Sequence, residues 1–547
     1  MASLDKELCK ITELIEKSTI IEERNPARYR LKLITHDLDP SEPYRKMTFG
    51  KRDSKKPHKT LLMVGETGTG KTTLINAIVN YMLGVKREDK VWFEITDDQG
   101  NQKSVHSQTS IITVYGFYLQ ESKTDLTIID TPGYGETGGV DLDKRIAISL
   151  HSLSKSAEGV HEIHAVCLVV KVTQKQLSDR QQYIFDAVLS LFGRDIAENI
   201  VLLFTYSTGA PPKKALTAVK EAKIKCAVND KKKPVYFLFD NCQSDAADEE
   251  QEMIQEQSSE DFKEKSWNLS HNGMMGFFTF LENIKPKTLH MTQEVLQKRK
   301  QLEANVSNLQ LRIQVMDQKQ NELKQTQAAL EKNRKYVEEN NDFEYEAKVS
   351  YKEKIPISSE FWHLTKEATC CTVCQENCHY PGCWWVRDLS WCSVMKKNHC
   401  TVCTNRCHYS KHVKEATIYV PKTKKEKRTY EGLKKEYDGK IGDGMSLVNK
   451  LEEELQELEK EKIKLLNEAY YSVESLEMIA LNTDSLLTLL HIDFLIVKLK
   501  EINEPEKAKK LEDIKKRAGE ANTEGLKYIK RLHTFFYSTC TSLVHTW

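Results

Sequence analysis

The sequence has no long run of apolar residues and no excess of charge of either sign. Its 547 residues include 81 basic and 80 acidic side chains, a net charge of +1. No overall field therefore attracts nucleic acid or an anionic membrane. The most apolar late stretch, 486–497, is too short to span a bilayer and contains Asp493. We expect neither a transmembrane segment nor a nucleic-acid partner.

The first residues, 1–7, also lack the apolar segment that directs secretion, and Ala2 predicts no N-myristoylation. We therefore expect a cytoplasmic protein. Disulfides are rare in that compartment, so the 14 cysteines require another explanation. A charged fraction of 29% beside an apolar fraction of 39% is typical of a globular part joined to long solvated helices.

A complete phosphate-loop motif, G-x-x-x-x-G-K-[ST], extends from Gly65 to Thr72. The apolar run 61–64 precedes it and apolar residues at helical spacing follow in 73–79, which is the strand–loop–helix context that the motif requires. Lys71 would contact the β- and γ-phosphates, and the Thr72 hydroxyl would bind Mg²⁺. The predicted nucleotide contacts of the loop are Gly65, Glu66, Thr67, Gly68, Thr69, Gly70, Lys71, Thr72 and Thr73.

The apolar segment 127–129 leads into Asp130-Thr131-Pro132-Gly133, the second half of a P-loop GTPase site. Asp130 would hold a Mg²⁺-bound water, and the Gly133 amide would donate to the γ-phosphate. Thr109 is our candidate for the hydroxyl that binds Mg²⁺ only while the γ-phosphate is present and so orders the first switch, with Ser110 as the alternative. We place the second switch at 134–139. It contains no glutamine to orient water, so we expect hydrolysis on the order of 10⁻³ s⁻¹ or slower.

Strands and helices alternate along this part of the chain as in a parallel α/β sheet. We predict buried strands at 164–170, 200–204 and 235–239, and helices at 141–156, 181–192, 215–223 and 274–284. The predicted fold is an α/β P-loop NTPase domain at 58–288, with three layers and a mostly parallel sheet. An N-terminal helix, a strand and a linker would occupy 1–57.

These residues resemble the G domains of septins and of the immune-associated nucleotide-binding (GIMAP-like) GTPases. The resemblance is carried by the phosphate loop, by 130–133 and by 173–209, and it covers about 58–288. It implies a domain that binds GTP or GDP with Mg²⁺ and self-associates through its nucleotide face.

One position departs from that family pattern. The run from Thr205 has Thr208 where an Asp is expected to accept two hydrogen bonds from guanine. A hydroxyl accepts one weaker bond, so we expect the loss of about 1.5–3 kcal/mol of guanine preference. Asp240 and Asn241, after the next strand, would supply part of the lost recognition.

An apolar residue returns every seven positions after the G domain, which predicts a coiled-coil helix at 289–345. The seam is Val295, Leu302, Leu309, Met316, Leu323, Leu330 and Val337. A return helix at 421–470 carries Leu451, Leu455, Leu458 and Leu465, and further helices follow in 471–547. We expect an antiparallel hairpin of the two helices, and the alternative is a parallel dimer of two chains. The basic run 422–428 would begin the return helix, and the alternative is a patch that binds nucleic acid or phospholipid.

Nine of the 14 cysteines lie between Cys370 and Cys407. The pattern that begins at Cys371 (C-x₂-C-x₃-C-H) recurs from Cys400, and two such knuckles supply ligands for two tetrahedral zinc sites. The candidates are Cys371, Cys374, Cys378, His379, Cys383, Cys392, Cys400, Cys403, Cys407 and His412. We expect a structural zinc-binding segment, 346–420, at the tip of the helical arm. The sequence leaves sequential and interleaved ligation open.

The sequence therefore predicts a GTP-binding protein with slow hydrolysis that acts as a nucleotide-dependent switch or assembly protein. It would associate with a second copy through the G domain or the coiled coil, or with a protein partner that the sequence does not identify. The alternative is an interaction scaffold that holds its nucleotide structurally and turns over little.

Overall fold

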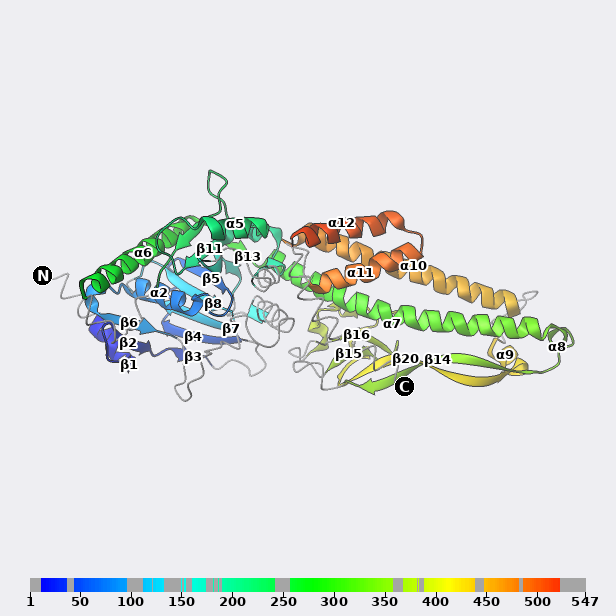
Figure 1. Cartoon of the computed structure of the whole chain (residues 1–547). Coiled ribbons are helices and arrows are strands. Elements are labelled where there is room, and N and C mark those ends of the chain that lie inside the picture. The colour runs from blue at the N-terminus through cyan, green and yellow to red at the C-terminus, as the bar shows by residue number, and fades with distance from the viewer. Residues whose placement is uncertain are drawn as a thin grey trace. The chain divides into compact units, whose positions relative to one another are not determined.

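The computed structural model of this chain describes most of its residues in two compact units. The described residues are 11–36, 44–95, 112–120, 122–131, 160–173, 189–241, 256–357, 367–380, 388–437, 447–481 and 486–521, with Ser149, Ser152, Leu153, Gln181, Phe185 and Gly382. The first unit comprises 1–296, 479–486 and 517–547, and the second comprises 297–478 and 487–516 (Figure 1). Among the described helices, none is long and apolar enough to cross a membrane.

The first unit is built on an eight-stranded sheet with the order β12-β11-β10-β5-β8-β7-β4-β3. Its strands are β3 (Ile34–Thr35), β4 (Tyr44–Gly50), β5 (His58–Val64), β7 (Ile112–Tyr118), β8 (Asp125–Asp130), β10 (Ala165–Lys171), β11 (Ile200–Thr205) and β12 (Tyr236–Leu238). All neighbouring strands are parallel except β3 with β4 and β7 with β8. The mostly parallel α/β sheet predicted from the sequence is therefore confirmed.

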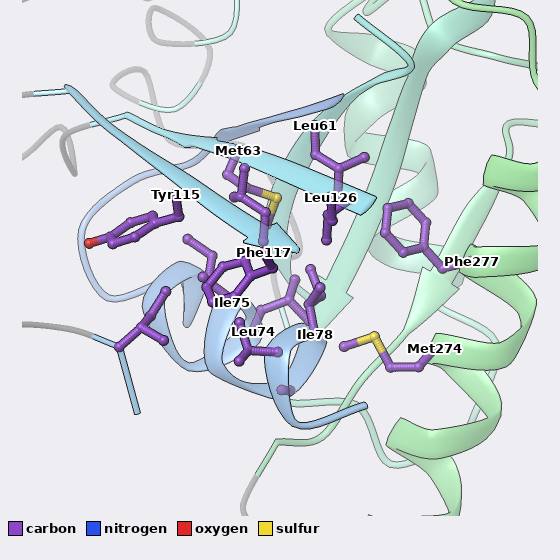
Figure 2. Packing of buried hydrophobic residues seen from close by; sticks show 14 of the residues in the cluster. Leu61, Met63, Leu74, Ile75, Ile78, Tyr115, Phe117, Leu126, Met274 and Phe277 are labelled. Carbon is purple, nitrogen blue, oxygen red and sulfur yellow. The ribbon is translucent and has the colours of Figure 1, made fainter. Parts of the chain in front are cut away.

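Alternate residues of the central strands enter two separate cores, because successive side chains of a strand point to opposite faces of the sheet. Leu61 and Met63 of β5 face α2 (Lys71–Leu83) and α6 (Glu256–Asn283), and Figure 2 shows them beside Ile75 and Phe277. Leu62 and Val64 enter the core on the opposite face, which includes α5 (Lys213–Glu221). Burial on both faces explains why these strands read as continuous apolar runs.

We predicted an N-terminal helix, a strand and a linker in 1–57 and the start of the G domain at 58, but that boundary is wrong. β4 pairs in parallel with β7 over its whole length, from Tyr44 opposite Ile112 onward. A further sheet has the order β1-β2-β6. Its strands are β1 (Ser18–Glu22), β2 (Ala27–Leu31) and β6 (Val91–Glu94), and the short β9 (Glu162–Ile163) pairs with β13 (Lys287–Thr288). Several of these outer strands contain charged residues among apolar ones; β4, for example, has Arg45 and Lys46 next to Met47. The alternation of apolar and polar residues is therefore less regular in them than in the central strands.

His164, just before β10, is a buried titratable group in the first unit. Its Nδ1 accepts a hydrogen bond from the Thr60 N–H at 3.1 Å. Burial, with a smaller effect of the Lys59 charge, lowers the pKa of His164 from 6.5 to about 4. Its neutral form is therefore the folded form, and its contribution to stability is complete above pH 6.5 and is lost as the pH falls toward 4.

We expect the variant His164→Asn to lose less stability on acidification than the wild type. Asn keeps an acceptor for Thr60 but has no proton to gain. The measurement is urea unfolding of the full chain at about pH 7 and about pH 4.5. Identical losses of unfolding free energy in the two proteins would contradict this role of His164.

In the second unit, α7 (His290–Lys332) and α10 (Leu447–Ile479) lie antiparallel in one chain. Leu323 and Leu330 of α7 share a cluster with Leu451 of α10. Nearer the start of α7, Lys462 Nζ lies 3.5 Å from Asp317 Oδ1. The remaining helices are α8 (Arg334–Glu338), α9 (Tyr430–Tyr437), α11 (Leu486–Glu501) and α12 (Pro505–Ala521).

The prediction that the cysteine-rich segment forms the tip of the helical arm is wrong. The two long strands β14 (Glu344–Pro356) and β20 (Thr417–Thr429) pair along their full length and return the chain along α7. Thirteen extended residues span about 43 Å. The segment therefore contacts the early part of α7, where Asn308 Nδ2 donates to the Glu376 carboxylate at 3.0 Å.

The prediction that the return helix begins at 421 is also wrong, because the basic run 422–428 lies in β20. Its lysines have acidic neighbours within the hairpin. Lys422 Nζ lies 2.5 Å from Glu353 on β14, and Lys424 Nζ lies 2.5 Å from Glu426. The first pair joins β20 to β14 and the second lies within β20. Thus pairing with β14 gives an extended conformation to a segment whose composition alone suits a helix.

The last helices pack on α10. Lys507 Nζ of α12 donates to Asn467 Oδ1 of α10 at 2.5 Å.

Between α10 and α11 the chain joins the first unit, where the Leu481 N–H donates to the Phe192 carbonyl at 2.9 Å. The predicted domain 471–547 is therefore divided between the two units, because Leu481 completes the core beneath β10 and β11.

Candidate functional site

The phosphate loop connects the end of β5 to the start of α2 in a conformation that its glycines permit. Gly68 and Gly70 have φ of +78° and +80°, in the left-handed region that L-residues rarely adopt. A side chain at Gly65 would place Cβ 2.8 Å from the Thr69 hydroxyl and 3.0 Å from the Val169 carbonyl. The loop therefore packs closely against the sheet at Gly65 and has positive φ at Gly68 and Gly70. Such a backbone can direct several N–H groups toward one bound anion.

Lys71 and Asp130 meet at the N-terminus of α2. Asp130 ends β8 and lies opposite Met63 of β5. The Lys71 ammonium, 6% exposed, lies 2.5 Å from Asp130 Oδ1 and 2.5 Å from the Thr131 carbonyl. Thr72 follows on the first turn of α2, which has no acidic residue. The cation, the helix N-terminus and the nearby carboxylate fit a phosphate chain with its Mg²⁺.

Thr205 supports the loop from the end of β11. Its hydroxyl donates to the Thr69 carbonyl at 2.6 Å. Beyond it, Lys171 Nζ lies 5.3 Å from the centroid of the exposed Tyr206 ring. Thr208 is exposed. The contact made by Thr205 in this structure is with the loop backbone, so its side chain positions the loop.

Asn241 is an unpaired buried amide at the position where we expected base recognition. Its side chain is 8% exposed, and neither Nδ2 nor Oδ1 has a hydrogen-bond partner among the described residues. The backbone N–H groups of Asp240 and Asn241 both donate to Ser270 Oγ, at 3.0 and 3.1 Å. Sequence reasoning missed Ser270, because it comes from α6, far along the chain, and no motif includes it.

Several predicted residues lie outside the described part of the chain. They are Thr109, Ser110 and Gly133, the second switch at 134–139, and Cys383.

The cysteine module, residues 367–415, brings two groups of four metal-ligating residues together. In each group the ligand atoms all lie within 4.8 Å of one another. The first group is Cys371, Cys374, Cys403 and Cys407, and the second is Cys378, Cys400, Cys403 and His412. Each group draws on both halves of the repeat, so an ion held by either group would be ligated in the interleaved way. His379 lies outside both groups, with its Nδ1 3.2 Å from Cys392 Sγ.

The chemistry of these groups suits a bound cation. Burial raises the pKa of the Cys371 thiol to about 11, whereas the hydrogen bond from Cys378 lowers the pKa of Cys400 to about 3. The thiols thus share protons, and full ionisation requires a positive ion among them. His412 Nδ1 lies 3.1 Å from the His408 carbonyl, and its buried Nε2 has no partner among the described residues. This is the usual environment of a metal-binding histidine.

The cysteine module contains little regular secondary structure, and its strands are short. β15 (Ala368–Cys371) pairs with β16 (Glu376–His379) and β19 (His412–Glu415), and β17 (Met395–Lys396) pairs with β18 (His399–Cys400). Its buried centre consists largely of cysteine sulfur with Val394, Met395 and Val402. So small an apolar core gives little stability by itself.

Comparison with known proteins gives a family match for part of the first unit. Residues 59–259 match the model of the AIG1 family. A search of curated proteins gives no match. Among solved structures, Toc33 from Arabidopsis thaliana, a dimerization-deficient mutant, has 18% sequence identity and a TM-score of 0.24, covering 34% of this chain and 71% of that chain. Toc33 in complex with Mg²⁺ and GMPPNP has 18% identity and a TM-score of 0.23, covering 34% and 72%.

A further similar structure is the translation elongation factor SelB from Methanococcus maripaludis in complex with the GTP analogue GppNHp. It has 13% identity and a TM-score of 0.23, and the alignment covers 43% of this chain and 36% of that chain.

Proposed function

From the premise that residues 59–259 are an AIG1 family domain, a GTPase G domain of the P-loop type, we propose that this protein binds GTP and GDP with Mg²⁺ and acts as a nucleotide-dependent switch. The observation that carries the proposal is the meeting of Lys71 and Asp130 at the N-terminus of α2. Either residue alone occurs in many folds. Together, at the start of α2 and the end of β8, they would supply the phosphate-binding and Mg²⁺-binding halves of one site.

Lys71 connects this site to the second switch. In the structure its ammonium lies 2.5 Å from Asp130 Oδ1 and 2.5 Å from the carbonyl of Thr131, three positions before the proposed second switch. With nucleotide bound, the phosphates compete for Lys71, and Asp130 is free to hold Mg²⁺-bound water together with the Thr72 hydroxyl. The Lys71 contact to the Thr131 carbonyl is then lost, whereas the Thr131 hydroxyl still donates to the Met63 carbonyl. In this proposal the loss of the Lys71 contact lets the second switch respond to the γ-phosphate.

Base recognition in this proposal depends on Asn241. Burying an amide whose donor and acceptor have no partners lowers the stability of the protein by about 1–3 kcal/mol, and a ligand that pairs with them recovers this free energy. The edge of a guanine presents both a donor and an acceptor, and Ser270 fixes the backbone that carries Asn241. Thr208, exposed on the neighbouring loop, supplies no charge. The GTP preference over ATP is therefore smaller than a carboxylate at that position would give.

The test is equilibrium titration of the full chain with GTP, GDP and ATP in the presence of Mg²⁺, for the wild type and for Thr208→Asp. We expect the wild type to bind GTP and GDP, and we expect Thr208→Asp to raise the ratio of GTP to ATP affinity about tenfold, or about 1.4 kcal/mol. Thr208→Asn, similar in size but uncharged, is the control and should change the ratio little. If none of the three nucleotides binds to the wild type, the proposal is overturned.

We also propose slow hydrolysis and nucleotide-dependent self-association. The slow rate follows from the absence of glutamine in the sequence 134–139. The alternative is a scaffold that retains its nucleotide. GTP turnover per molecule, measured over a range of protein concentrations, separates the two, because turnover that rises with concentration requires self-association and excludes a passive scaffold.

For the second unit we propose a structural zinc-binding module beside a coiled-coil arm formed by α7 and α10. The two four-residue groups and the shared leucine cluster support these roles. We propose a cytoplasmic location, where reducing conditions keep the cysteine thiols available to zinc.

A further inference from the structure

We propose that Cys403 bridges two zinc ions, so that the cysteine module holds one dinuclear cluster instead of two separate sites. The inference deepens the proposed zinc-binding role of the module and rests on it. It comes from the way in which the two ligand groups share one residue.

Among the residues that the structure describes, the number of ligands requires a bridge if both ions are four-coordinate and all of their ligands come from these groups. Two separate tetrahedral sites need eight ligand atoms. The two groups supply seven, six thiolate sulfurs and one imidazole nitrogen, because Cys403 belongs to both. A thiolate has enough lone pairs to bind two ions, so seven ligands complete two tetrahedra when one sulfur is shared.

The spacing of the sulfurs fits such an arrangement. Cys374 Sγ and Cys407 Sγ lie 3.7 Å apart, and the edge of a tetrahedron with Zn–S bonds of about 2.3 Å is about 3.8 Å. Cys403 Sγ lies within 4.8 Å of both these sulfurs and also of the ligand atoms of Cys378 and Cys400. Its sulfur is therefore near the centre of the cluster.

The internal repeat explains why only one cysteine is shared. Cys374 and Cys403 occupy equivalent positions in the two halves. In a symmetric cluster both would belong to both groups, but His412 stands in the second group where Cys374 would be. His412 is 5% exposed and its Nε2 has no partner among the described residues. The histidine thus replaces one of the two possible bridges.

Charge also favours two ions over one. Six thiolates gathered in a mostly buried site repel one another strongly. Two Zn²⁺ ions neutralise four of those negative charges, whereas a single ion neutralises two. Backbone N–H groups moderate the remainder: the Cys403 N–H donates to Cys400 Sγ at 3.4 Å, and the Cys407 N–H donates to Cys403 Sγ at 3.3 Å.

The experiment compares the zinc content of full-length variants, purified under reducing conditions, by mass spectrometry of the metal. We expect Cys403→Ser to lose two ions relative to the wild type, because each ion loses a ligand. Cys374→Ser and His412→Gln, each in one group only, should lose one ion each. Cys370→Ser removes a buried thiol outside both groups and should lose none. Loss of a single ion in Cys403→Ser would overturn the bridge.

A spectroscopic measurement on the wild type decides the question if Cys403→Ser does not fold. After exchange of zinc for cadmium-113, a shared thiolate predicts two cadmium resonances split by coupling to each other through the sulfur. Two unsplit resonances would overturn the bridge and leave the proposed zinc binding intact. Complete absence of metal from the wild type would overturn both proposals.

Discussion

Replacing Lys71 by alanine should weaken GTP binding at least about 100-fold, or about 3 kcal/mol. The ammonium would make charge-assisted contacts to the phosphates, each contributing about 1.5–3 kcal/mol. Its loss also leaves the buried Asp130 carboxylate without the cation that lies 2.5 Å away and so increases the repulsion of an anionic ligand. The measurement is titration with a fluorescent GTP analogue at constant Mg²⁺.

Lys220→Ala is the matched control for Lys71→Ala. Lys220 is an exposed lysine of α5, and its loss should leave the affinity within a factor of about two. Thermal unfolding of both variants separates lost binding from lost folding, because a folded Lys71→Ala protein retains its circular dichroism spectrum. Equal GTP affinity in Lys71→Ala and the wild type would show that the phosphate cradle is not used, and the proposed function would fail with it.

Removal of zinc should unfold the cysteine module and leave the G domain folded. Structural zinc contributes about 10–16 kcal/mol to small zinc-binding folds at neutral pH, which exceeds the stability that so small an apolar core provides. The module contacts α7 through Glu376, whose carboxylate accepts from Asn308 and from the Thr404 N–H. We therefore expect the early part of α7 to lose protection as well.

Hydrogen exchange followed by mass spectrometry measures this effect. With a strong chelator, amides of β15, β16 and β19 should exchange at least about 100-fold faster, while those of β5, β10 and β11 keep their rates. Cys400→Ser should have the same effect without the chelator. Cys226→Ser, which removes a half-buried thiol of the G domain, is the control. Unchanged protection of the module without metal would exclude a structural role for zinc.

The conformation of the phosphate loop was the most predictable feature of the molecule, because it depends on neighbouring residues in the sequence. Six consecutive positions from Gly65 to Gly70 specify a loop that only glycine permits at Gly68 and Gly70. The central strands were also predictable, since both of their faces are buried and their apolar runs are unbroken. The strands β1 and β4 were not predicted, because most of their residues are exposed or only partly buried and their apolar pattern is weak.

Contacts between residues distant in sequence could not be predicted in the same way. Ser270 reaches Asn241 only because α6 lies against β12, and Leu481 enters the G-domain core after the chain has passed through the second unit. The cysteine repeat predicted two metal sites, but the sharing of Cys403 depends on how its two halves fold against each other.

The sequence by itself determined which chemistry we propose for this protein: a phosphate cradle, a carboxylate to hold Mg²⁺ and a set of thiolate ligands. Each depends on residues a few positions apart, whose geometry follows from short-range backbone and side-chain sterics. Tertiary structure alone decided that the hairpin β14–β20 folds back and places the cysteine module along α7 instead of at its end. The direction in which the β14–β20 hairpin runs depends on its packing along about 43 Å of extended chain. The spacing of residues within a short segment of sequence does not specify that direction.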